Sequence, residues 1–130
     1  MNILLDTCAL VWSISDPSRL GPDALALLQA PDSDVSVSAI SAPEIACLVE
    51  RGRLKLNRPW AEWFRSNVAR NRWTVRDVSL DILIEAYSLP GAFHADPADR
   101  VLVATARLFD LVLLTSDGNV TDYPHVQTRW

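Results

Sequence analysis

Four acidic residues have the type and spacing that could support chemistry. Asp6 ends the apolar run "ILL", Asp117 follows the run "LVLLTS", and Glu44 and Asp99 begin segments with helical spacing. Four carboxylates brought together would repel one another by about 4 kcal/mol per pair at 4 Å and an effective dielectric constant near 20. A divalent cation turns this repulsion into attraction, and an all-oxygen site suits Mg²⁺ or Mn²⁺ rather than Zn²⁺. The chemistry available to such a group is metal-assisted hydrolysis.

Each of these acids also has a purely structural explanation, and the sequence leaves both open. Asp6 is a favoured N-cap for a helix that begins one residue later, and Asp117 with the glycine after it is a common turn pair. Residues 41–44 have the S-x-x-E pattern of a capping box, in which the serine and glutamate close the start of a helix. Asp96 followed by proline is a typical helix start, and it places Asp99 in the first turn, where an acid suits the helix dipole.

The elements that must position these acids alternate between strands and helices. The predicted strands are 2–6, 34–40, 73–79, 111–116 and a short one near Val126, and the predicted helices are 7–14, 21–30, 41–54, 59–70, 80–89 and 96–109. Strands that alternate with helices of about 10–14 residues predict parallel βαβ units with helices on both faces of the sheet. We therefore predict a single domain over residues 1–130 with a three-layer α/β/α fold and a central parallel sheet of four to five strands.

A parallel sheet would bring the four acids to one edge. Asp6 and Asp117 would end two buried strands, and Glu44 and Asp99 would begin two helices just after a strand or loop. Sheets of this kind bind ligands at the carboxyl ends of their strands, near the point where the strand order reverses. We predict that the four carboxylates converge there, which helix capping alone would not require.

The composition is that of an ordinary globular protein, with 49% hydrophobic and 22% charged residues. Cys8 and Cys47 lie in apolar runs without C-x-x-C spacing, so we expect buried, reduced thiols. The apolar run at the N-terminus stops at Asp6, too early for a signal peptide, and no stretch approaches the roughly 18–20 apolar residues of a membrane span. These features predict a cytoplasmic protein without contact to a membrane.

Charge is distributed unevenly along the chain. Residues 51–76 contain eight arginine or lysine residues and one glutamate, a net charge of +7, whereas the whole chain carries −4. The remainder therefore carries −11, and the contrast predicts two surfaces with different partners. A solvated helix face is the simpler explanation for the basic segment.

Four blocks of the sequence resemble PIN-domain ribonucleases, and most closely the VapC toxins of VapBC toxin–antitoxin modules. The blocks are "LLDTCALVW", "SAISAPEIACLVERGRL", "HADPADRVLVATA" and "LLTSDGNVTDY", in this order, and the resemblance covers nearly the whole chain. It implies that Asp6, Glu44 and Asp99 are the core acids and Asp117 the more variable fourth acid, all four acting as metal ligands and in catalysis. The bulky aromatic that relatives often carry before the glutamate is replaced here by Ala42-Pro43.

The resemblance also implies supporting residues around these acids. Small hydroxyl residues, polar residues before the fourth acid and the first acid of the Asp-Pro-x-Asp block match positions near the site: Thr7, Ser41, Thr115, Ser116 and Asp96. His94 matches a common histidine of the same block, and an ordinary surface loop histidine explains it equally well.

The implied activity is endoribonuclease chemistry with one or two Mg²⁺ or Mn²⁺ ions, in which Asp117 or Glu44 takes a proton from water. Arg100, Arg51 and Arg53 are candidates for contacts with RNA phosphates. Three tryptophans could stack on unpaired bases, although burial between helices is the simpler explanation for the first two: Trp60, Trp63 and Trp73. The resemblance further implies a homodimer and a VapB-like antitoxin that sends a basic side chain into the acidic pocket.

Other classes of protein fit less well. A dehalogenase-type phosphatase needs Asp-x-Asp after its first strand, but Cys8 occupies the second position, and a receiver domain needs an early acidic pair and a late lysine. The alternative that remains is a non-catalytic module that keeps the fold, uses the acids only as caps, and acts by binding protein or RNA. The sequence does not distinguish transfer, ribosomal and messenger RNA as targets.

Overall fold

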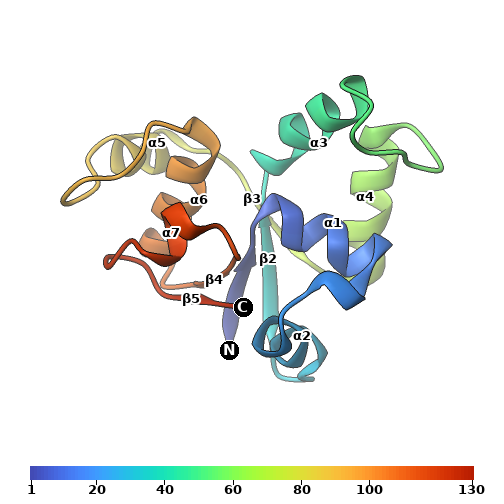
Figure 1. The fold of residues 1–130 in the computed structure, drawn as a ribbon, viewed down its shortest axis with the longest axis horizontal. Helices are drawn as coiled ribbons and strands as arrows, with labels where there is room; N and C mark the ends of the chain where they lie inside the picture. Colours follow the sequence, from blue (N-terminus) through green and yellow to red (C-terminus); the bar gives the residue numbers. More distant parts are fainter.

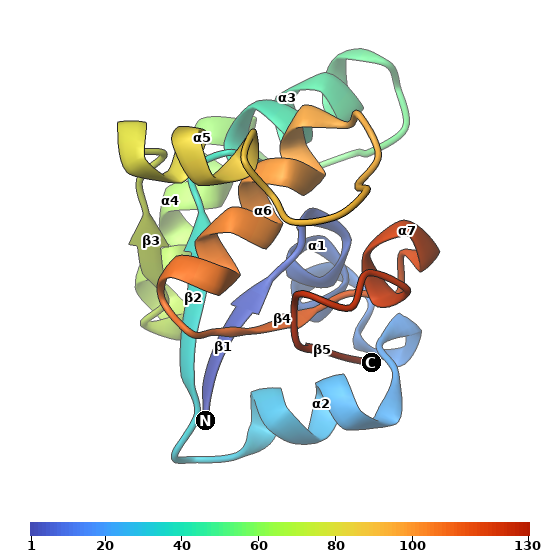
Figure 2. The ribbon, with the colours of Figure 1, turned by 90° about the vertical axis from the view of Figure 1, so that its left-hand side faces the viewer.

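The computed structural model describes residues 1–130 as a five-stranded parallel sheet with helices on both faces (Figures 1 and 2). The elements in chain order are β1 (Asn2–Leu5), α1 (Thr7–Ser15), the 3₁₀ turn η1 (Pro17–Arg19), α2 (Pro22–Gln29), β2 (Asp34–Ser38), α3 (Ser41–Glu50), α4 (Trp60–Asn71), β3 (Thr74–Arg76), α5 (Leu80–Ala86), α6 (Pro97–Leu108), β4 (Val112–Leu114), α7 (Gly118–Thr121) and β5 (Thr128–Arg129). Figure 1 shows α1 to α4 on one side of the sheet and α5 to α7 on the other. The predicted three-layer α/β/α architecture with a parallel sheet is confirmed.

The strand order places the predicted site at the centre of the sheet. The strands lie in the order β3-β2-β1-β4-β5, and all four neighbouring pairs are parallel. The chain moves outward from β1 through β2 to β3 and then returns to the other side of β1 with β4, so the order reverses between β1 and β4. At this point the backbone N–H of Asp6 donates to the carbonyl of Leu114 at 3.2 Å, which joins the ends of the two strands.

Burial on both faces explains the continuous apolar runs of the central strands. Ile3 and Leu5 of β1 pack into the core beneath α1 to α4, whereas Leu4 packs into the core beneath α6. Leu4 stands opposite Leu113 of β4 in the parallel register, and both side chains are fully buried. Successive residues of a strand point to opposite faces, so a strand covered on both sides must be apolar at every position.

Most element boundaries follow the local signals in the sequence. Pro22 stands in the first turn of α2, Asp96 caps α6 ahead of Pro97, and Gly52 adopts φ +70° just after α3. The strands and α5 are shorter than predicted, and the last strand begins at Thr128 rather than near Val126. A glycine-containing turn was expected after Asp117, but the chain forms the short helix α7 there.

Two expectations about burial are wrong. Cys8 and Cys47 are free thiols, but both are exposed because their helices turn Ala9 and Ile45 into the core instead. Trp63 is buried as expected, whereas Trp60, the first residue of α4, is 37% exposed. No helix is both long enough and apolar enough to cross a membrane.

Candidate active site

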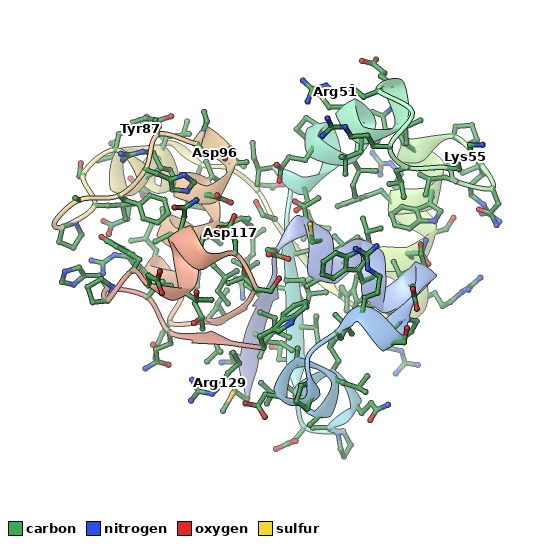
Figure 3. All side chains as sticks on the ribbon, in the orientation of Figure 1. Arg51, Lys55, Tyr87, Asp96, Asp117 and Arg129 are labelled. Atoms are coloured by element: carbon green, nitrogen blue, oxygen red, sulfur yellow. The ribbon has the colours of Figure 1, made fainter.

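Five carboxylates line one pocket of about 290 Å³ at the carboxyl ends of β1 and β4. They are contributed by the segments that precede or begin α1, α3, α6 and α7: Asp6, Glu44, Asp96, Asp99 and Asp117. Cys8, Leu102 and Ser116 complete the wall together with Thr7, and no lysine or arginine lines it. Figure 3 shows Asp96 and Asp117 on neighbouring elements at this edge. The structure therefore brings all four predicted acids to one place.

Asp6 and Asp117 are both helix caps and pocket residues. One oxygen of Asp6 accepts from the backbone N–H of Ala9 at 2.7 Å, and one oxygen of Asp117 accepts from that of Asn119 at 2.9 Å. Each cap uses one carboxylate oxygen and leaves the second one free of that bond. The structural and functional explanations for these residues are therefore compatible, because the cap also fixes where the carboxylate points.

The predicted capping box at Ser41 and Glu44 is wrong. α3 is preceded by Ile40 without any side-chain cap, and Ser41 lies inside the helix, fully buried. The Ser41 hydroxyl is 2.9 Å from that of Thr7, and the Thr7 hydroxyl donates to Glu44 Oε1. These contacts join the first turns of α1 and α3, so Thr7 positions the Glu44 carboxylate at the pocket. Nothing in the local spacing could reveal a partner 37 residues away.

Asp96 and His94 hold Asp99 at the start of α6. Asp96 caps the helix by accepting from the backbone N–H of Asp99 at 3.0 Å. His94 Nε2 lies 2.9 Å from Asp99 Oδ2, and both side chains are partly buried. His94 is therefore a partner of a pocket acid rather than a solvated loop residue.

The hydroxyl residues near the fourth acid have different positions. Thr115 is buried, and its side-chain oxygen accepts from the backbone N–H of Asp117 at 3.1 Å. Ser116 is exposed and lines the pocket. Thr115 therefore shapes the turn that carries Asp117, while Ser116 faces the cavity.

Burial and mutual repulsion raise the pKa values of three pocket acids. Burial is the largest cause in each case, and the charge of a neighbouring acid adds to it: Asp117 acts on Asp6, and Asp96 acts on both Glu44 and Asp99. The pKa of Asp99 rises from 3.8 to about 6, although His94 opposes the rise. Although Cys8 is exposed as a residue, its thiol lies in the pocket wall, where loss of solvent and then the charges of Asp6 and Glu44 raise its pKa to about 11. A cation in the pocket would relieve this unfavourable charge.

The donors of the pocket fit a hard divalent cation. They are carboxylate and hydroxyl oxygens, the ligand type of Mg²⁺ and Mn²⁺, and the single thiol is held protonated. As the side chains stand, no three of them form a group that could hold one ion directly. Mg²⁺ usually keeps several water ligands and uses one or two protein carboxylates, so direct contact with all four acids is not needed.

Arg100 has a different role from the predicted phosphate contact. Its guanidinium donates to the carbonyls of Ala86, Phe93 and His94, each at 3.0 Å, and so ties the segment after α5 to α6. Arg51 and Arg53, beyond the end of α3, are exposed and have no side-chain partner in the protein. Figure 3 places Arg51 with the α3–α4 side of the molecule, apart from Asp96 and Asp117.

A larger hollow, of about 560 Å³, lies at the opposite edge of the sheet around Arg107 and His125. Arg107 is engaged there by Glu85 at 2.8 Å and by the carbonyl of His125 at 2.7 Å. The charge of Arg107 is thus already paired, and we assign the candidate chemistry to the smaller acidic pocket, where the five carboxylates gather.

Comparison with known proteins agrees with this geometry. Residues 3–126 match the PIN domain. Ribonuclease VapC22 of Mycobacterium tuberculosis is 32% identical over 124 residues, which cover 95% of this chain and 93% of that protein. The chain belongs to the VapC family of PIN-domain ribonuclease toxins.

Solved structures show the same fold at lower sequence identity. VapBC2 from Rickettsia felis, bound to a DNA fragment from its promoter, matches with a TM-score of 0.70 and 17% identity over 100% of this VapC chain and 99% of that one. A toxin–antitoxin complex from Klebsiella pneumoniae matches with a TM-score of 0.67 and 22% identity over 98% of both chains. The likeness extends over the whole chain, including the edge of the sheet that carries the acids.

Proposed function

We propose that this VapC chain is a metal-dependent endoribonuclease that hydrolyses RNA phosphodiester bonds at the acidic pocket. The observation that carries the proposal is the convergence of Asp6, Glu44, Asp96, Asp99 and Asp117 on one cavity without a lysine or arginine. Burying several carboxylates beside one another is unfavourable, and their raised pKa values express this. A site for Mg²⁺ or Mn²⁺ gives a reason for the arrangement that helix capping does not.

Asp6, Glu44, Asp99 and Asp117 would hold the cation, with Asp96 supporting Asp99 through the helix cap. When bound, a divalent cation acidifies water and neutralises the charge that develops on the phosphate. Glu44 or Asp117 would accept the proton from the attacking water. Thr7 keeps the Glu44 carboxylate in place, and Thr115 fixes the turn that presents Asp117.

The exposed arginines would guide the RNA strand to the pocket. Arg51 is the residue that caps the end of α3, seven residues and about 10 Å along the helix axis from Glu44, and Arg53 follows it. Both side chains are unpaired, so they are free to contact phosphates of an RNA strand that extends from the pocket past the end of α3. Since Arg100 is committed to backbone carbonyls, we give it no part in RNA binding.

The acidic pocket also explains how an antitoxin would inhibit the enzyme. A lysine or arginine from a VapB-like partner would enter the pocket, pair with the acids and replace the cation. We place this reaction in the cytoplasm, where RNA and the antitoxin are both available. For self-association we propose a homodimer, because four large side chains on one face of α5 and at the residue that caps its end are exposed: Leu80, Leu83, Ile84 and Tyr87.

One observation favours the alternative of a non-catalytic binding module. Asp6, Asp96 and Asp117 all accept backbone N–H groups at helix starts, so each has a structural use without any metal. The two functions differ in their response to substitution. In a binding module, Asp6→Asn would leave the affinity for Mn²⁺ unchanged, whereas in a nuclease it would weaken Mn²⁺ binding.

The experiment uses antitoxin-free protein, end-labelled total RNA, and Mg²⁺, Mn²⁺ or EDTA. Asp6→Asn and Asp99→Asn test the pocket, and Asp32→Asn, an exposed residue before β2, is the matched control. We expect discrete metal-dependent products from the wild type and the control, and at least a 100-fold loss in both pocket variants, about 2.7 kcal/mol. Equal cleavage by Asp99→Asn, or cleavage that persists in EDTA, would contradict the proposal.

A further inference from the structure

A third cavity, a hollow of about 430 Å³, lies beside the acidic pocket between the segment before α6 and the helix α7. His94 belongs to its wall and touches Asp99, while Asn119 lies two residues beyond Asp117. The hollow and the acidic pocket are therefore linked by the contact between His94 and Asp99 and by the step along the chain from Asp117 to Gly118. A substrate that crosses the acidic pocket would meet this hollow with its next unit.

The wall of the hollow is aromatic and held in place. Phe93 packs edge to face against His94 and Tyr123, with ring centroids 4.7 and 4.9 Å apart. The Tyr123 hydroxyl donates to the carbonyl of Pro90, and Arg100 donates to the carbonyls of Phe93 and His94. These bonds connect the wall to α6 and to the segment before β5, so its shape is formed before a ligand arrives.

The rim of the hollow is polar and unoccupied by protein partners. Asn119 and Asp122 are exposed, and neither side chain makes a hydrogen bond within the protein. No lysine or arginine lines the hollow, and the Asp122 carboxylate would repel a phosphate. The hollow therefore fits a flat, uncharged group with hydrogen-bonding atoms on its edge, such as an unpaired nucleobase.

We propose that this hollow is a nucleobase subsite that takes an unpaired guanine next to the scissile phosphate. The proposal rests on the proposed ribonuclease function and adds a specificity element to it. Guanine is the base that presents two adjacent N–H donors beside a carbonyl acceptor. Asp122 accepts both donors, the Asn119 amide donates to the carbonyl, and the ring lies against the aromatic wall of Phe93 and His94. Adenine, cytosine and uracil lack that pair of donors.

The test measures base binding without cleavage. Guanosine, adenosine, cytidine and uridine, which are uncharged, are added at equal concentration to ¹⁵N-labelled full-length protein in EDTA. We expect guanosine to shift the resonances of Asn119 and Phe93 at least three times more than the other nucleosides. Asp122→Asn and Asn119→Ala should lose this response, and Asp32→Asn, which is exposed at the opposite edge of the sheet, should keep it. The absence of shifts, or equal shifts from all four nucleosides, would overturn the proposal.

A second arm separates this proposal from the nuclease proposal. Cleavage sites are mapped on one RNA with wild type, Asp122→Asn and Asp99→Asn. We expect the wild type to cut beside guanine and Asp122→Asn to lose about tenfold of that preference, because the variant loses the acceptor for both guanine donors. Guanosine binding without any cleavage by the wild type would refute the nuclease proposal and leave the subsite standing. Cleavage without guanosine binding would refute the subsite alone.

Discussion

Replacing Asp99 with asparagine tests whether the acidic pocket is strained in the absence of a cation. The pKa of Asp99 is raised from 3.8 to about 6, first by burial and then by the charges of Asp96, Asp117 and Glu44. Below about pH 4 the group is protonated in the folded and the unfolded protein alike. Between about pH 4 and 6 the folded state binds more protons, so stability falls as the pH rises through this window and the loss is complete above it.

The magnitude follows from the size of the pKa change. A rise of about two units corresponds to about 3 kcal/mol at neutral pH. Because the side chain is 21% exposed, we expect about 2 kcal/mol in practice. In a domain of this size such a gain raises the Tm by about 6 °C. Asp99→Asn should therefore be more stable than wild type at neutral pH and no more stable at acidic pH.

The assay is thermal unfolding in EDTA at about pH 4 and about pH 7.5, with Asp32→Asn as the control. Adding Mg²⁺ at neutral pH should raise the Tm of the wild type, because a ligand that binds only the folded state stabilises it. Asp99→Asn should lose most of that response. A variant no more stable than wild type at pH 7.5 in EDTA would refute the electrostatic reasoning, whatever its effect on cleavage.

Three further predictions concern other parts of the molecule. Thr7→Val removes both hydrogen bonds that join α1 to α3 and should lower the free energy of unfolding by about 2–3 kcal/mol. Denaturant titration measures this loss, and a loss of less than about 0.5 kcal/mol would contradict the role of Thr7. Gly21→Ala would place a Cβ 2.4 Å from the Trp130 backbone and should destabilise the folded protein by about 1–3 kcal/mol. In Gly118→Ala the added Cβ meets no atom within 4 Å, so the Tm should change little. Equal Tm values for the two variants would be inconsistent with this packing. Cys8, with its pKa of about 11, should be alkylated by iodoacetamide at pH 8 about 100-fold more slowly than an ordinary thiol of pKa 9. Mass spectrometry follows the alkylation, and a rapid reaction would show that the thiol is not held protonated.

The fold was predictable because its signals are local. The runs Ile3–Leu5 of β1 and Val112–Leu114 of β4 are apolar at every position, and this pattern requires a sheet covered on both faces. Alternation with helical segments then selects parallel strands, since each crossover needs a helix. The start of α6 at Asp96 followed by proline could be located in the same way, from the backbone requirements of a helix start.

The lengths and the fine contacts could not be predicted in this way. A run such as "SAPE" satisfies the local rule for a capping box, yet Ser41 and Glu44 turn to Thr7, which lies on another helix. Arg100 follows the pocket acid Asp99 in the sequence. Its guanidinium nevertheless donates to backbone carbonyls of residues 86–94, and these bonds use its N–H groups. The choice between such partners depends on which surfaces meet, and short-range spacing carries no information about that.

The sequence by itself determined the layers of the fold, because hydrophobic period and helix-start chemistry operate over a few residues. Its four ordered blocks carried the resemblance to the family and to the family's acids. The sequence predicted that Asp6, Glu44, Asp99 and Asp117 converge at one edge of the sheet, but only the tertiary structure placed them in one cavity. It alone revealed the aromatic hollow with Asn119 and Asp122. Both depend on the reversal of strand order between β1 and β4. That reversal brings the ends of segments more than 100 residues apart into contact.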